Sequence, residues 1–189
     1  MTLALRTFIA SLSRGDIVFL HFSGHGEESA GSTYLLPSDF GHGSLRDDAV
    51  NLNHIMTDFN QLDLDLTAII VLDCCRANKE ATWKGVECGL AARSTVESAE
   101  RGRAPSSVHF LIASSFSSNP AIGSLDGAGD RNDLFTSCHS SPHSGMRLTD
   151  VLNHAAESLL KKSKGKQRAW VSQTPSVRLG SLTLRPSGS

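Results

Sequence analysis

The sequence lacks any apolar run long enough to cross a bilayer, since its longest ones, "IVFL" and "LTAIIVL", have only the length of strands. A basic leader followed by a continuous apolar block is also missing from the first residues, "MTLALRTFIASLSRGD", which disfavours a signal peptide. Basic residues are not in excess, because the net charge is −1, so the chain has no general attraction to nucleic acid or membranes. We therefore expect a cytoplasmic protein with neither of those partners.

Cysteine is scarce and unevenly placed, with four residues of which two are adjacent. This does not match the disulfide framework of a small secreted protein, and a reducing compartment is the default for such a chain. The stretch "SCHSSPH" at 137–143 has ligand types near metal spacing, but no second cysteine pair accompanies it. We therefore expect no metal site from the residue pattern.

The arrangement of apolar residues predicts strands that alternate with helices. Nearly continuous apolar stretches predict strands at "DIVFLHF", "DLTAIIVLD" and "VHFLIAS", with shorter ones within "GSTYLLPSDF" and "AWVSQTPSVRL". Helical spacing predicts helices over 2–13, 46–62 and 146–163. We expect a single α/β domain with a mostly parallel sheet over residues 1–182, with an exposed linker at 78–107 and a tail at 183–189.

Two polar motifs follow the predicted strands: "SGHG", which we expect to form a turn, and "CCRA". Ligands of open α/β sheets bind at the carboxyl ends of the strands, so the histidine and the cysteines are expected to meet at one rim. A thiol with a nearby base is the apparatus of nucleophilic cysteine catalysis. Taken alone, Gly-His-Gly is more often a simple turn, and Cys-Cys is more often buried packing.

Strand alternation favours one of the two cysteines as the nucleophile. Asp73 and Cys75 project to one side of a strand and Cys74 to the other, so a cleft that holds Asp73 also holds Cys75. His25 is then the candidate base, and the amides of Gly26 and Cys75 are candidate donors to an oxyanion. Asp73 has a second interpretation, as the cap of a following helix.

The blocks "DIVFLHFSGHG" and "TAIIVLDCCRA" resemble the two signature blocks of the caspase-like cysteine peptidases, which include caspases and metacaspases. The candidate histidine and cysteine stand fifty positions apart, which matches the family's spacing. Weaker resemblances follow in "YLLPSD", "HFLIASSFSSNPAIG", "DLFTSC" and "QRAWVSQTPSV". The resemblance implies a three-layer αβα sandwich and a cysteine-type endopeptidase with a Cys-His dyad. It also implies that the chain is N-terminally incomplete, since the family has two strands before the histidine block.

The resemblance further implies the substrate. Metacaspases have an aspartate two residues before the nucleophile, where it lines the first specificity pocket, and Asp73 stands at the matching position here. The resemblance therefore implies cleavage after Arg or Lys. Ser23, Ser114 and Ser115 are the expected hydroxyl donors along the groove. Calcium is possible as a cofactor by resemblance only. Five basic residues within 78–107 also predict self-processing there. The alternative is a catalytically inactive caspase-like fragment that serves as a binding or scaffold module.

Overall fold

A computed structural model of the chain describes residues 1–29, 32–41, 43–77, 108–117, 145–165, 167–174 and 177–183. Within these ranges, residues 75–77, 115–117, 167, 170, 177 and 178 are described by their backbone alone. The predicted linker at 78–107, the motif at 137–143 and the segment "DLFTSC" lie outside the described residues. No helix in the described part of the chain is both long and apolar enough to span a membrane.

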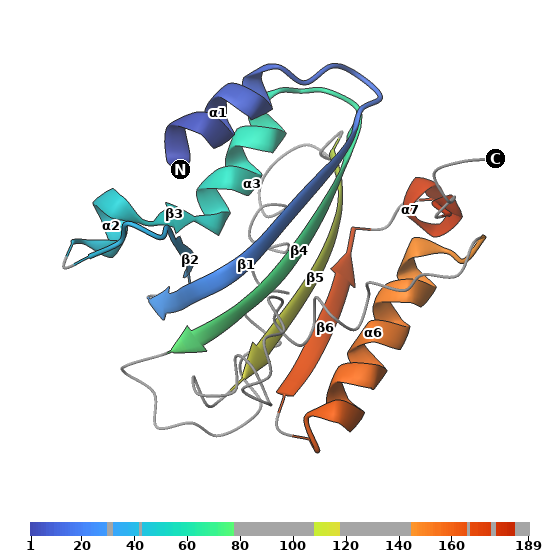
Figure 1. The fold of residues 1–189 in the computed structure, drawn as a ribbon. Helices are drawn as coiled ribbons and strands as arrows, with labels where there is room; N and C mark the ends of the chain where they lie inside the picture. The colour runs from blue at the N-terminus through green and yellow to red at the C-terminus, as the bar shows by residue number, and fades with distance from the viewer. Residues whose placement is uncertain are drawn as a thin grey trace.

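The described strands form one six-stranded sheet whose three central strands are parallel (Figure 1). The strands are β1 (Ile17–Ser29), β2 (Ser32–Leu36), β3 (Val50–Asn51), β4 (Leu66–Ala77), β5 (Val108–Ser117) and β6 (Gln167–Gln173), in the spatial order β3-β2-β1-β4-β5-β6. β1, β4 and β5 run parallel, whereas β2, β3 and β6 extend the sheet by antiparallel pairing. The carboxyl ends of the three parallel strands therefore lie at one edge of the molecule.

Helices cover both faces of this sheet and complete three layers (Figure 1). The helices are α1 (Thr2–Ala10), α2 (Leu45–Asp48), α3 (Leu52–Gln61), α6 (Leu148–Lys162) and α7 (Val177–Ser181). α1 and α3 supply buried residues to the core on one face, and α6 and α7 supply them on the other. The expected αβα sandwich with a parallel central sheet is confirmed.

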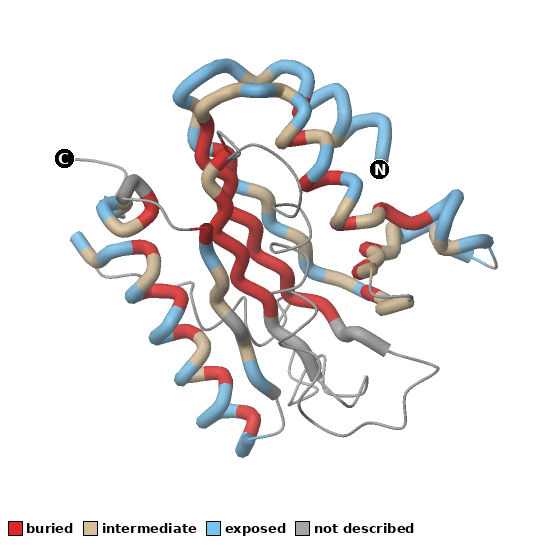
Figure 2. The backbone as a smooth tube through the Cα atoms, turned by 180° about the vertical axis from the view of Figure 1, so that it is seen from behind, coloured by how far each residue is buried: buried red, intermediate tan, exposed pale blue. Residues whose placement is uncertain are grey.

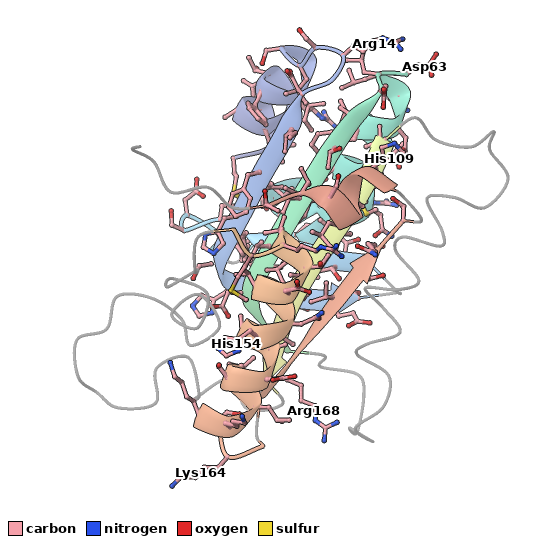
Figure 3. All side chains as sticks on the ribbon, turned by 90° about the vertical axis from the view of Figure 1, so that its right-hand side faces the viewer. Arg14, Asp63, His109, His154, Lys164 and Arg168 are labelled. Carbon is pink, nitrogen blue, oxygen red and sulfur yellow. The ribbon has the colours of Figure 1, made fainter. Side chains whose placement is uncertain are left out.

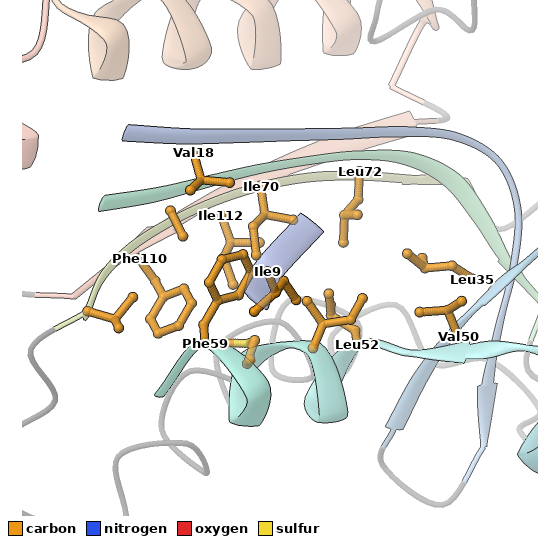
Figure 4. Close-up of a cluster of buried hydrophobic side chains, with 14 of the residues drawn as sticks. Ile9, Val18, Leu35, Val50, Leu52, Phe59, Ile70, Leu72, Phe110 and Ile112 are labelled. Atoms are coloured by element: carbon orange, nitrogen blue, oxygen red, sulfur yellow. The ribbon is translucent and has the colours of Figure 1, made fainter. Parts of the chain in front are cut away.

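The first core lies between α1, α3 and the even-numbered side chains of the parallel strands (Figure 4). Phe59 of α3 is fully buried, and its ring meets that of Phe110 in β5 edge-to-face, with the centroids 6.1 Å apart and the planes at 80°. Ile70 and Ile112 lie beside them in the same cluster. The apolar stripe of α3 packs against the even-numbered side chains of the strands. The helical repeat of α3 and the two-residue repeat of the strands therefore both place apolar side chains at this interface.

The second core explains why β4 is apolar along nearly its whole length. Its odd-numbered residues Ile69 and Val71 pack with Leu111 of β5 and with Leu152 and Leu159 of α6. A strand that is covered on both faces has no solvent side, so its sequence shows no alternation of apolar and polar residues. This is the pattern that makes "LTAIIVL" the clearest strand signal in the sequence.

β1 differs from β4 because one of its faces stays open to solvent (Figure 2). Val18 is buried in the first core, whereas Ile17 and Phe19 on the opposite face are 60% and 58% exposed. The same exposed face continues through His21 to His25. A solvent-accessible strip of the sheet therefore leads directly to the glycine-flanked histidine.

Three local expectations were wrong, and each has a physical reason. The motif "SGHG" is not a turn, because β1 continues through it to Ser29 and pairs there with β2. The predicted helix over 46–62 is two helices separated by β3, because Val50 pairs with Leu35 and the Asn51 side chain caps α3 by accepting the Asn53 and His54 amides. The short helix α7 replaces the end of the last predicted strand.

Candidate active site

His25 lies near the carboxyl end of β1, between two strand neighbours. On one side it stands opposite Leu36 of β2, and on the other it stands opposite Cys75 of β4. Its side chain is exposed, on the face of β1 that no buried apolar residue occupies. The flanking glycines contribute no side chains, so the two neighbouring strands, rather than a turn, hold the imidazole in place.

Cys75 stands opposite this histidine in an unbroken parallel register. The pairing of β1 with β4 begins at Ile17↔Thr67 and reaches Glu27↔Ala77 without a bulge. Adjacent strands lie about 4.8 Å apart, and residues in register share a face of the sheet. The backbone therefore puts Cys75 and His25 side by side on one face, although fifty positions separate them in the sequence.

Cys74 belongs to the opposite face of β4. Its side chain is 3% exposed and packs in the first core with Leu72 and Ile112. This burial is typical of a cysteine that serves as a small apolar residue. Of the two adjacent cysteines, only Cys75 is on the face of the exposed histidine.

Asp73 and Ser23 form the next row of the sheet, two residues before the Cys-His row. Ser23, Asp73 and Ser115 stand opposite one another on three neighbouring strands. Asp73 is buried at 2% exposure, whereas Ser23 is exposed. The structure therefore places a buried carboxyl group and an exposed serine in neighbouring strands, one row from the candidate nucleophile.

Ser114 does not join this row. It stands opposite Leu72 and is 1% exposed. It therefore lies on the face of the sheet that forms the first core, which also holds Leu72 and Cys74. The expectation that Ser114 and Ser115 both line one groove is therefore wrong for Ser114, because neighbouring residues of a strand lie on opposite faces.

A hollow of about 680 Å³ adjoins His25 on its β2 side. It is lined by Phe22, Ser23, Gly24 and His25 of β1, by Leu36, Pro37, Ser38, Asp39 and Phe40, and by Met1. The residues after β2 were not expected at the site from the sequence. The signal for them was the "YLLPSD" block, but only the pairing of His25 with Leu36 shows that the chain beyond position 36 passes beside β1.

The family model described as the caspase domain matches residues 1–179. The chain belongs to the caspase-domain family. No curated protein matches it. Membership in a peptidase family supports a cysteine-peptidase-like function and, with it, a polypeptide substrate.

A solved structure shares the fold of this caspase domain. Protein GSU0716 from Geobacter sulfurreducens aligns with a TM-score of 0.51 and 16% sequence identity, over 97% of this chain and 75% of that one. At this level of identity the likeness concerns the fold alone. It agrees with the three-layer arrangement around a parallel central sheet.

The other end of the caspase domain carries a different histidine. Figure 3 shows His109 toward the same end of the molecule as Arg14 and Asp63, where the parallel strands begin, away from Lys164 and Arg168. His109 Nε2 lies 3.8 Å from Asp65 Oδ1, and both side chains are partly exposed. Because His25 lies at the carboxyl ends instead, these two histidines belong to different parts of the domain.

Gly26 of the caspase domain is buried and has strand neighbours on both sides, Leu35 and Arg76. An amide in such a position is normally used by the ladder. The predicted role of Gly26 as an oxyanion donor therefore requires its N–H to turn from the ladder toward substrate.

The described residues of the caspase domain hold no group of three or more His, Cys, Asp or Glu side chains arranged to bind a metal ion.

Proposed function

We propose that this caspase domain is a cysteine-type endopeptidase with Cys75 as nucleophile and His25 as its acid–base partner. The observation that carries the proposal is the register pair His25↔Cys75 at the carboxyl ends of two parallel strands. The exposure of the histidine on that face supports access for a substrate. Thiolate attack requires a base within reach of the thiol, and adjacent strands, about 4.8 Å apart, can bring the two side chains that close.

The proposed reaction has two stages. The Cys75 thiol gives its proton to His25, and the thiolate attacks the peptide carbonyl carbon. The imidazolium then returns the proton to the leaving amine as the C–N bond breaks, which leaves a thioester on the cysteine. Water, deprotonated by the same imidazole, hydrolyses the thioester and regenerates the thiol. Amides near Gly26 and Cys75 are the proposed donors to the oxyanion.

The proposed specificity is for arginine or lysine before the scissile bond. A carboxylate as buried as Asp73 favours a cationic partner and disfavours a second carboxylate. Ser23 beside it supplies a hydroxyl that is exposed to an incoming side chain. The backbone position of Ser115 on the other side is consistent with a further donor in the same row.

Asp73→Asn should lower kcat/KM for a fluorogenic peptide with arginine at the cleaved position by about 10- to 100-fold, the effect expected from the loss of a charged hydrogen-bonding partner. An otherwise identical peptide with aspartate at that position should be a poor substrate for both proteins. Asp150→Asn, on an exposed position of α6, is the matched control and should leave the rate unchanged. Preferential cleavage after aspartate by the unaltered protein would overturn the specificity.

Self-processing is proposed for the segment 78–107, on its sequence alone. An enzyme that cleaves after basic residues meets five of them there: Lys79, Lys84, Arg93, Arg101 and Arg103. Incubation of the purified chain should generate new termini after one or more of these residues, as read by mass spectrometry, and Cys75→Ala should stay intact. An active enzyme that keeps this segment whole would refute the idea.

A second candidate function is a caspase domain without turnover that serves as a binding scaffold. Two observations favour it: Gly26 lies within a ladder on both sides, and Asp73 is almost fully covered. Activity on the arginyl peptide separates the two candidates, because the scaffold predicts no difference between the unaltered chain and its Cys75 variant.

A further inference from the structure

Most of the residues that line the hollow beside His25 have no part in the nucleophile, the base or the row of Ser23, Asp73 and Ser115. The hollow includes Ser23 and His25 but not Asp73, and it extends from β1 toward the segment that follows β2. β2 pairs with β1 only from His25 onward. Before that point the two segments diverge, and the hollow occupies the space between Phe22–His25 and Leu36–Phe40.

The roles of Cys75 and His25 in the proposed reaction indicate which part of a substrate lies in the hollow. Cys75 is on one side of His25, in β4, and the hollow is on the other side, toward β2. The imidazole protonates the departing amine, so the leaving segment must lie against the imidazole. The hollow therefore lies on the side of the leaving amine rather than on the Cys75 side of the acyl group. Its lining also includes Met1 and Phe22, and Phe22 packs against the first core, so the hollow takes in residues from both faces of β1.

The lining of the hollow indicates which residues it favours. Leu36, Pro37 and Phe40 give it partly buried apolar walls, and Asp39 adds an exposed carboxylate. Gly24 contributes only backbone, and a Cβ at that position would lie 3.2 Å from the Phe22 ring. An apolar wall with one carboxylate complements a side chain that has an aliphatic stem and a positive end.

We propose that this hollow binds the residues on the carboxyl side of the scissile bond, and that Asp39 makes it prefer a basic over an acidic residue there. The inference rests on the proposed peptidase function and adds a second specificity element to it. Asp39 would act on the leaving segment, whereas Asp73 acts on the residue that forms the acyl group of the thioester. The occupant is thus the second half of the same polypeptide substrate.

The test uses two peptides that have arginine at the cleaved position and differ only in the next residue, lysine or glutamate. Cleavage after the arginine is quantified by mass spectrometry, so that cleavage after the lysine is not counted. The ratio of kcat/KM for the lysine peptide over the glutamate peptide should exceed one. In Asp39→Lys that ratio should fall about tenfold, and in Asp39→Asn by a smaller factor, as expected for an exposed charge pair.

Glu157→Lys is the matched control, because it makes the same charge change at an exposed position of α6 and should leave the ratio unaltered. An equal ratio in the unaltered protein and Asp39→Lys would overturn the subsite.

A binding experiment separates the subsite from the chemistry. In Cys75→Ala, a short amidated peptide that begins with lysine should shift the amide NMR signals of Gly24, Asp39 and Phe40 more than its glutamate counterpart. Those shifts without any hydrolysis by the unaltered chain would contradict the proposed peptidase and retain the subsite. Equal shifts with both peptides, or shifts confined to other residues, would reject the subsite whether or not the arginyl peptide is cleaved.

Discussion

Cys75→Ala should lower kcat/KM for an arginyl fluorogenic peptide by about 10⁴-fold or more, because the substitution removes the only atom that forms the thioester. The residue stands opposite His25 in the β1–β4 register, on the same face as Asp73. Steady-state kinetics with the purified variant gives the ratio, and circular dichroism checks that the fold is intact. A variant that retains a tenth of the activity would contradict the assignment of the nucleophile.

Cys74→Ala is the matched control for this experiment, since it makes the same change one residue earlier. Cys74 is 3% exposed and packs in the first core, on the face away from the histidine. Its replacement should leave kcat/KM within about threefold, while the free energy of unfolding falls by about 1 kcal/mol, as for a typical buried substitution. Equal losses of activity in the two variants would mean that the face assignment is wrong.

His25→Ala should lower kcat/KM for the same peptide by about 10²- to 10⁴-fold, the range that general acid–base catalysis contributes. The loss has two parts, because the imidazole both takes the thiol proton and returns it to the leaving amine. Steady-state kinetics at a fixed pH measures the change directly.

His21→Ala provides the comparison within the same strand. His21 is also exposed and lies on the same face of β1, but it stands opposite Val71 and not opposite a cysteine. Its removal should change kcat/KM by less than about threefold. If His21→Ala caused the larger loss, the register pair would not be the catalytic pair.

Much of the scaffold could be predicted from the sequence because burial on both faces leaves a simple pattern. "DLTAIIVLD" and "VHFLIAS" form β4 and β5, and the predicted helix at 146–163 is α6. The glycine-flanked histidine misled the local interpretation, since glycine usually marks a turn. In the structure β2 returns to pair with His25–Ser29, and this nonlocal pairing keeps the motif extended.

The alternation of side chains along a strand predicts part of the candidate site. The rest depends on which residues of neighbouring strands stand opposite one another. Alternation alone predicts that Cys75 shares a face with Asp73 and that Cys74 lies on the other face, and the burial of Cys74 in the first core agrees with this. The same rule could not separate Ser114 from Ser115, because nothing in the sequence states which of them stands opposite Asp73. The hollow beside His25 was missed for a related reason: it forms between segments whose contact depends on where β2 stops pairing.

Labelling with a peptidyl-arginine chloromethyl ketone, followed by peptide mapping, tests the central claim most directly. The thiolate displaces chloride from the reagent, so the labelled residue identifies the nucleophile and the labelling rate reports its activation by the base. The account predicts one adduct, on Cys75, that forms at least tenfold more slowly in His25→Ala and not at all in Cys75→Ala. An adduct on Cys74, or labelling of Cys75 at the same rate without the imidazole, would contradict it.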